Sequence, residues 1–138
     1  METAYIYLAL SGMLTVLLWI PYVLTRPFIW GLPAFLRNYT EGFPATEPEP
    51  PLWAQRSKRA HLNMVETMPA FVAVVVAAGF LVGDTAGANV ALWAQVFFFA
   101  RLIHALVYTL SVPYVRTPVY LVSWAAVLMI GMTALTAG

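Results

Sequence analysis

The sequence predicts an all-α integral membrane protein built as a four-helix bundle. Of its 138 residues 62% are hydrophobic and only 9% are charged, whereas a soluble domain carries about 25% charged residues. With a mean hydropathy of +0.79, polar groups are too few to cover the folded surface, so most of that surface faces lipid. A spanning helix needs about 20 mainly apolar residues. Four charge-free runs approach that length, at 3–25, 67–83, 85–100 and 117–138.

We expect four transmembrane helices within one membrane domain that covers residues 1–138. Their predicted ranges are about 4–25, 59–82, 87–110 and 116–136. The first run is expected to stay as a helix, because Met1 and Glu2 provide no basic start for a cleavable signal peptide. Helices are favoured over a barrel because a helix satisfies its own backbone polar groups in lipid, and strict alternation of polar and apolar residues is absent.

Three connectors join these helices, and their charges predict the orientation. A Pro-rich loop at 27–58 holds six of the ten prolines, which argues against one continuous helix there. The connectors at 83–87 and 111–115 are short. Basic residues concentrate between 26 and 59, Arg116 follows the third connector, and the second connector has none. The positive-inside rule therefore places the first and third loops in the cytoplasm.

Polar side chains form three short stripes at the cytoplasmic ends of the last three helices. Residues three, four or seven positions apart share one face of a helix. The stripes are Arg59, Asn63 and Glu66; Arg101, His104 and Tyr108; and Arg116 and Tyr120, with Thr117 beside them. Because ionisable groups are costly to expose to lipid, we expect the stripes to face the bundle interior and to line a pocket.

Each stripe also has a structural interpretation that needs no ligand. Glu66 and Arg101 would form an ion pair between the second and third helices. Arg59 would act as a positive-inside anchor, and Tyr108 and Tyr120 would belong to the interfacial aromatic belt. These interpretations leave the common depth of the three stripes unexplained. With two histidines, no cysteine and a net charge of +1, neither a metal site nor nucleic-acid binding is expected.

The stripes carry a family resemblance. Residues 59–66 resemble the R-A-H-x-N-x-x-E signature of the MAPEG family, the membrane-associated proteins in eicosanoid and glutathione metabolism. Residues 100–108 are similar to its A-R-x-x-H-x-x-x-Y motif, and residues 116–120 to its R-x-x-x-Y motif. The segments 21–24 and 53–56 resemble the bacterial branch. The likeness extends over the whole chain in length and in number of spans.

This resemblance implies a homotrimer that binds glutathione between neighbouring subunits near the cytoplasmic face. It implies a glutathione-dependent transferase or peroxidase in a bacterial inner membrane. Such a protein activates the glutathione thiol for attack on a lipophilic electrophile or hydroperoxide that arrives from the surrounding membrane lipid. Glutathione is then a co-substrate, and the second substrate comes from the bilayer.

The chemistry of glutathione matches the polar residues. Its carboxylates and peptide groups suit Arg59, Asn63 and Arg26, and its ammonium suits Glu66. Other side chains would line or brace the cavity: Arg101, His104, Tyr108 and Tyr120.

The expected catalytic residues lie at the start of the fourth helix. Arg116 combines its own charge with the positive end of the helix dipole, which favours an anion. The resemblance implies that Arg116 activates the thiol, and that Thr117 occupies a position where relatives have a hydroxyl group.

Two alternatives come from other functional classes. Four spans and an intramembrane glutamate also describe the small multidrug resistance transporters. Those proteins carry their essential carboxylate in the first span, and here residues 3–25 are uncharged. The other alternative is a membrane scaffold without catalysis.

Overall fold

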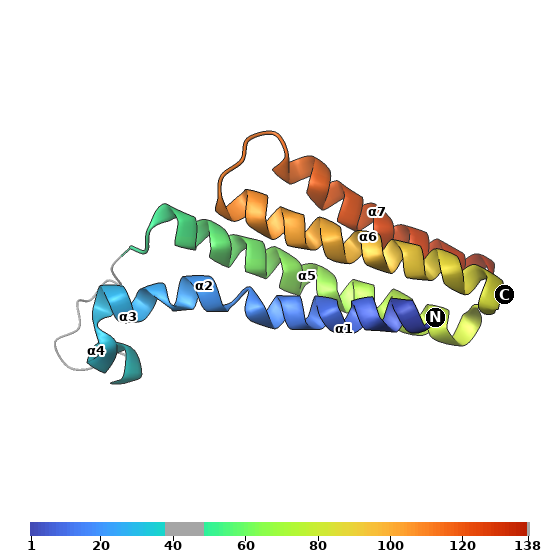
Figure 1. Cartoon of the computed structure of the whole chain (residues 1–138), viewed down its shortest axis with the longest axis horizontal. Coiled ribbons are helices and arrows are strands. Elements are labelled where there is room, and N and C mark those ends of the chain that lie inside the picture. The colour runs from blue at the N-terminus through green and yellow to red at the C-terminus, as the bar shows by residue number, and fades with distance from the viewer. Residues whose placement is uncertain (38–48, 138) are drawn as a thin grey trace.

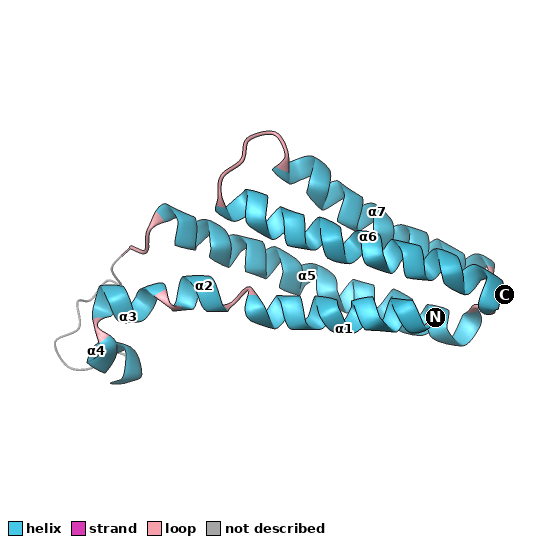
Figure 2. Ribbon diagram, viewed as in Figure 1, coloured by secondary structure: helices cyan, strands magenta, loops and turns pink. Residues whose placement is uncertain are grey.

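The computed structural model describes residues 1–37 and 49–137. Four helical stretches in these residues are long and apolar enough to cross a membrane. They lie side by side as an elongated bundle (Figure 1), and the described residues contain helices and loops but no strand (Figure 2). The predicted all-α membrane bundle is therefore confirmed.

The first span consists of three consecutive helical segments, α1 (Glu2–Leu17), α2 (Ile20–Val23) and α3 (Thr25–Trp30). The predicted end at residue 25 was too early, because helix continues to Trp30. Pro21 and Pro27 each fall in the first turn of a segment, where a missing backbone N–H costs no helical hydrogen bond. Gly31, with φ of 80°, then ends α3, and α4 (Leu32–Arg37) follows.

The second span, α5 (Leu52–Leu81), begins well before the predicted residue 59. The amides of Ala54 and Gln55 donate to the Pro51 carbonyl at 2.9 and 3.1 Å, which starts the helix directly after the last proline of the connector. The predicted start at residue 59 was placed where the charged residues end, at the expected membrane surface. The helix α5 continues beyond that surface. The predicted loop 27–58 thus contains helix at both ends, and its residues 38–48 lie outside the described residues.

The last two spans are α6 (Asp84–Thr109) and α7 (Arg116–Thr136), which form an antiparallel hairpin. The third span starts three residues before the predicted 87. Both chain ends lie at one end of the bundle, and α3, α4 and the α6–α7 connector lie at the other end (Figure 1). The polar residue stripes are therefore carried toward the end that holds the first and third connectors.

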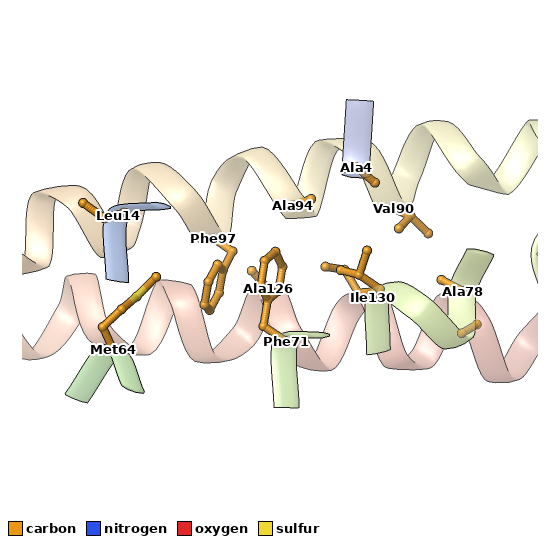
Figure 3. Packing of buried hydrophobic residues seen from close by; sticks show 12 residues of the cluster. Ala4, Leu14, Met64, Phe71, Ala78, Val90, Ala94, Phe97, Ala126 and Ile130 are labelled. Carbon is orange, nitrogen blue, oxygen red and sulfur yellow. The ribbon is translucent and has the colours of Figure 1, made fainter. Parts of the chain in front are cut away.

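All four spans contribute to one buried core (Figure 3). At its centre Phe71 of α5 and Phe97 of α6 stack with ring centroids 3.8 Å apart and planes 13° apart. Small residues such as Ala94 and Ala126, both fully buried, allow the helices to approach closely. Because lipid is as apolar as these side chains, close van der Waals packing holds the spans together.

The stacked pair gives a first prediction. Phe71→Ala should lower the free energy of unfolding in detergent by on the order of 2–4 kcal/mol, because it leaves a cavity against Phe97. Phe80→Ala, which changes a side chain 87% exposed on the same helix, should have little effect. Equal losses in the two variants would contradict the core as described.

Candidate functional site

Six of the ten predicted site residues line one cavity at the connector end of the bundle. Its volume is about 240 Å³. Its lining consists of Asn63 from α5, His104 and Tyr108 from α6, and Arg116, Thr117 and Tyr120 from α7. A second cavity of about 350 Å³ shares Tyr108, Arg116 and Thr117 with the first and adds Arg56 and Arg59. The three predicted stripes therefore do meet, and the combined walls are rich in cations.

Arg116 is the exposed cation of this site. Its guanidinium carbon lies 4.8 Å from the centroid of the Tyr108 ring, a cation–π contact that steadies the side chain while its N–H groups stay accessible. As the first residue of α7, Arg116 lies beside the unpaired backbone amides of the first helical turn. The exposed Thr117 adds a hydroxyl group next to it.

The connector before Arg116 is tight. Ser111 and Tyr114 both have left-handed backbone conformations, with φ of 60° and 64°. The Ser111 conformation lets the Val112 amide donate to the Val107 carbonyl at 2.9 Å, which satisfies the last turn of α6. A left-handed tyrosine is strained. This strain lies in the short connector that turns the chain so that α7 packs against α6.

His104 forms the buried inner wall. Its ring lies between two tyrosines, with centroid distances of 5.5 Å to Tyr108 and 5.8 Å to Tyr120. The His104 side chain is only 3% exposed. It therefore positions the two phenol rings more than it presents a reactive nitrogen.

Arg101, next to this wall, is 1% exposed and lies within the bundle. Its Nη2 donates to the Asn63 carbonyl at 2.9 Å and to the Thr67 hydroxyl, both on α5. Its guanidinium also lies 5.1 Å from the centroid of the Tyr120 ring on α7. Within the described residues Arg101 thus joins three spans and braces the cavity without lining it.

The possible ion pair between Glu66 and Arg101 is not formed in the described part of the chain. Nε and Nη1 of Arg101 have no hydrogen-bond partner there, and Glu66 lies exposed on the surface of α5. Consecutive helical residues point about 100° apart, and it is Thr67, the neighbour of Glu66, that contacts the Arg101 guanidinium directly. Thr67 was not among the predicted site residues, although its i, i+4 spacing from Asn63 was an available signal.

Arg26 is also separate from the Arg116 group. It lines a third cavity, of about 400 Å³, between the first span and the start of α5. Arg59 lines both this cavity and the one beside Arg116. One chain therefore places the predicted carboxylate-binding arginines in two neighbouring cavities with a common wall.

The profile of the MAPEG family matches residues 3–136. The chain belongs to the MAPEG family. A search of the curated proteins finds no match.

Membership in MAPEG confirms, at the level of the family, the resemblance drawn from the three motifs. It assigns the chain to a membrane family associated with glutathione and eicosanoid metabolism, and not to the small multidrug resistance transporters. The MAPEG match extends over all four spans, so it includes every residue of the cavities described above.

The buried arginine gives a second prediction. Thr67→Val removes an acceptor from a buried cation and should lower the free energy of unfolding by about 1–3 kcal/mol. The matched control is Thr136→Val, because Thr136 is exposed at the end of α7 and its hydroxyl bonds only within its own helix. If chemical unfolding in detergent shows the same small change for both variants, Arg101 does not depend on Thr67.

Proposed function

We propose that this MAPEG protein is a membrane-bound glutathione-dependent transferase that also reduces hydroperoxides. The observation that supports this function is the group around Arg116. An exposed cation with a hydroxyl neighbour lies between two adjoining cavities, one of which adds Arg56 and Arg59. Glutathione has two carboxylates against one ammonium, so these cations suit its net negative charge.

Arg116 would lower the pKa of the bound thiol. A thiol with a pKa of about 8.5 is only roughly 3% ionised at pH 7. Lowering that pKa by about two units corresponds to about 2.7 kcal/mol and makes the thiolate the main form. A guanidinium close to the sulfur provides stabilisation of this kind, and the Thr117 hydroxyl would donate a further hydrogen bond to the thiolate.

The thiolate would then react with a substrate that arrives from the lipid. With an electrophilic carbon, a sulfur–carbon bond forms and the leaving group departs with the bonding electron pair. With an organic hydroperoxide, the oxygen–oxygen bond breaks, the peroxide is reduced to an alcohol and water, and two glutathione molecules are oxidised to the disulfide. The exposed apolar surfaces of the spans give such substrates access from the bilayer.

Two predicted glutathione ligands, Glu66 and Arg26, do not line the cavities around Arg116. Glu66 is exposed within an apolar span, where a carboxylate needs polar surroundings. We therefore propose a homotrimer in which adjacent subunits bring Glu66 and Arg26 to glutathione held by Arg59 and Asn63. The first and third connectors would face the cytoplasm of a bacterial inner membrane, where glutathione is supplied.

Binding provides the primary test. Wild-type protein in detergent should release or absorb heat when titrated with millimolar glutathione, and Arg59→Ala and Glu66→Gln should each weaken the affinity about tenfold, since each removes a charged contact. Arg37→Ala, on α4 outside the three cavities, should bind like wild type. Absence of heat and of thermal shift for wild-type protein would refute the transferase proposal and leave the scaffold alternative.

Arg116 has a separate signature. Arg116→Ala should still bind glutathione but should lose the thiolate absorbance that appears on mixing, because the thiol pKa returns toward its ordinary value. Turnover of an aryl halide and of an organic hydroperoxide should fall with it. A variant that keeps the full thiolate signal would show that another group activates the thiol.

The proposed assembly is tested by mass. Native mass spectrometry in detergent should give three times the 15.3 kDa of one chain. A monomer that binds glutathione with wild-type affinity would rule out ligands from adjacent subunits.

A further inference from the structure

The short helix α4 lies outside the site proposed above. All of its residues are described by the structure, and they line none of the three cavities. Gly31, with φ of 80°, separates α4 from α3 and changes the direction of the chain. The Phe35 ring of α4 then packs on the Trp30 ring of α3, with centroids 6.5 Å apart. As a result α4 lies beside α3 and turns away from α5, α6 and α7 (Figure 1).

The length of the first span sets the level of α4 relative to the membrane. The helical stretch Glu2–Trp30 contains 29 residues, which at about 1.5 Å per residue gives a length of about 43 Å. A bilayer is about 40–45 Å thick when its head-group layers are included. The charged Glu2 favours one membrane surface, so Trp30 lies near the opposite surface, at the level where tryptophan is enriched. Because α4 follows Trp30 and packs on it, α4 lies at that same surface.

One face of α4 is apolar and exposed. Leu32 and Leu36 are four residues apart and so share a face of the helix, and they are 59% and 70% exposed. Phe28, near the end of α3, is 88% exposed and adds an apolar side chain just before the change of direction. Arg37, the only charged residue of α4, is exposed at its end. Leucine and phenylalanine together with a basic residue are typical of segments that lie in the membrane interface.

Two other surroundings fit these observations less well. Water would hydrate the two leucines although lipid is available at the same level. A second copy of the chain would pack beside the four spans, whereas α4 lies at the end of the bundle and turns away from three of them (Figure 1). We propose that α4 is a membrane-surface anchor. Leu32 and Leu36 insert among the acyl chains just below the phospholipid head groups, and Arg37 stays at the level of the phosphates.

The test measures how deep each side of α4 lies. The chain has no cysteine, so Leu36→Cys and Arg37→Cys, made as separate full-length proteins, each take a bimane label at one place. In phosphatidylcholine nanodiscs the label is quenched either by a phospholipid with a nitroxide at the top of its acyl chain or by iodide in the water. The ratio of lipid quenching to iodide quenching should be higher for Leu36→Cys by about threefold or more, because the apolar face of an interfacial helix is buried by about 5–10 Å.

A third label separates the possible surroundings of the helix. Leu32→Cys lies on the same face as Leu36→Cys and should give the same high ratio, so the result does not depend on a single substitution. Equally strong quenching of all three labels by iodide would place α4 in water and overturn the proposal. Weak quenching of the Leu32 and Leu36 labels by both agents would place them against protein, as in a contact with a second copy, and would overturn it too. None of these outcomes depends on glutathione binding.

Discussion

A buried guanidinium group is the constraint on which the rest of this bundle depends. Arg101 lies among three apolar spans, where a cation is tolerated only if protein atoms replace its water. The Asn63 carbonyl and the Thr67 hydroxyl provide that replacement from α5, and the Tyr120 ring contributes from α7. These contacts are made by Nη2 and by the face of the guanidinium, while Nε and Nη1 have no hydrogen-bond partner among the described residues. They constrain how α5 and α7 are rotated about α6, and with that the side chains that reach the cavities.

The fold could be predicted from the sequence because lipid imposes a simple rule. Spans must be long, apolar and helical, so hydropathy alone located all four. Helix ends were less predictable, since α5 begins at Leu52, outside the apolar stretch. The helix α5 begins where the run of prolines ends, and not at the level where the membrane surface is expected.

The candidate site was predictable only in part, for a reason of geometry. Spacing of three or four residues showed which side chains share a helix face, and six of them do meet. Spacing does not show which neighbouring helix a face meets. Opposite charges suggested pairing between Glu66 and Arg101, yet it is the Thr67 hydroxyl that contacts Arg101 directly, and Glu66 is exposed. Arg59, with a cavity on each side, could not be assigned to one group by any pattern along the chain.

The left-handed turn before Arg116 has a consequence for the position of this cation. The Tyr108 ring steadies the exposed Arg116 side chain, but the backbone of the preceding residues decides whether that side chain reaches the ring at all. Substitutions on the lipid-facing side of α7 leave that backbone unchanged. Insertion or deletion of a single residue between Ser111 and Val115 would instead change the path by which the chain reaches the start of α7, and would move the cation relative to its cavity. In this chain the position of Arg116 therefore depends on the length of the connector as well as on the residues within it.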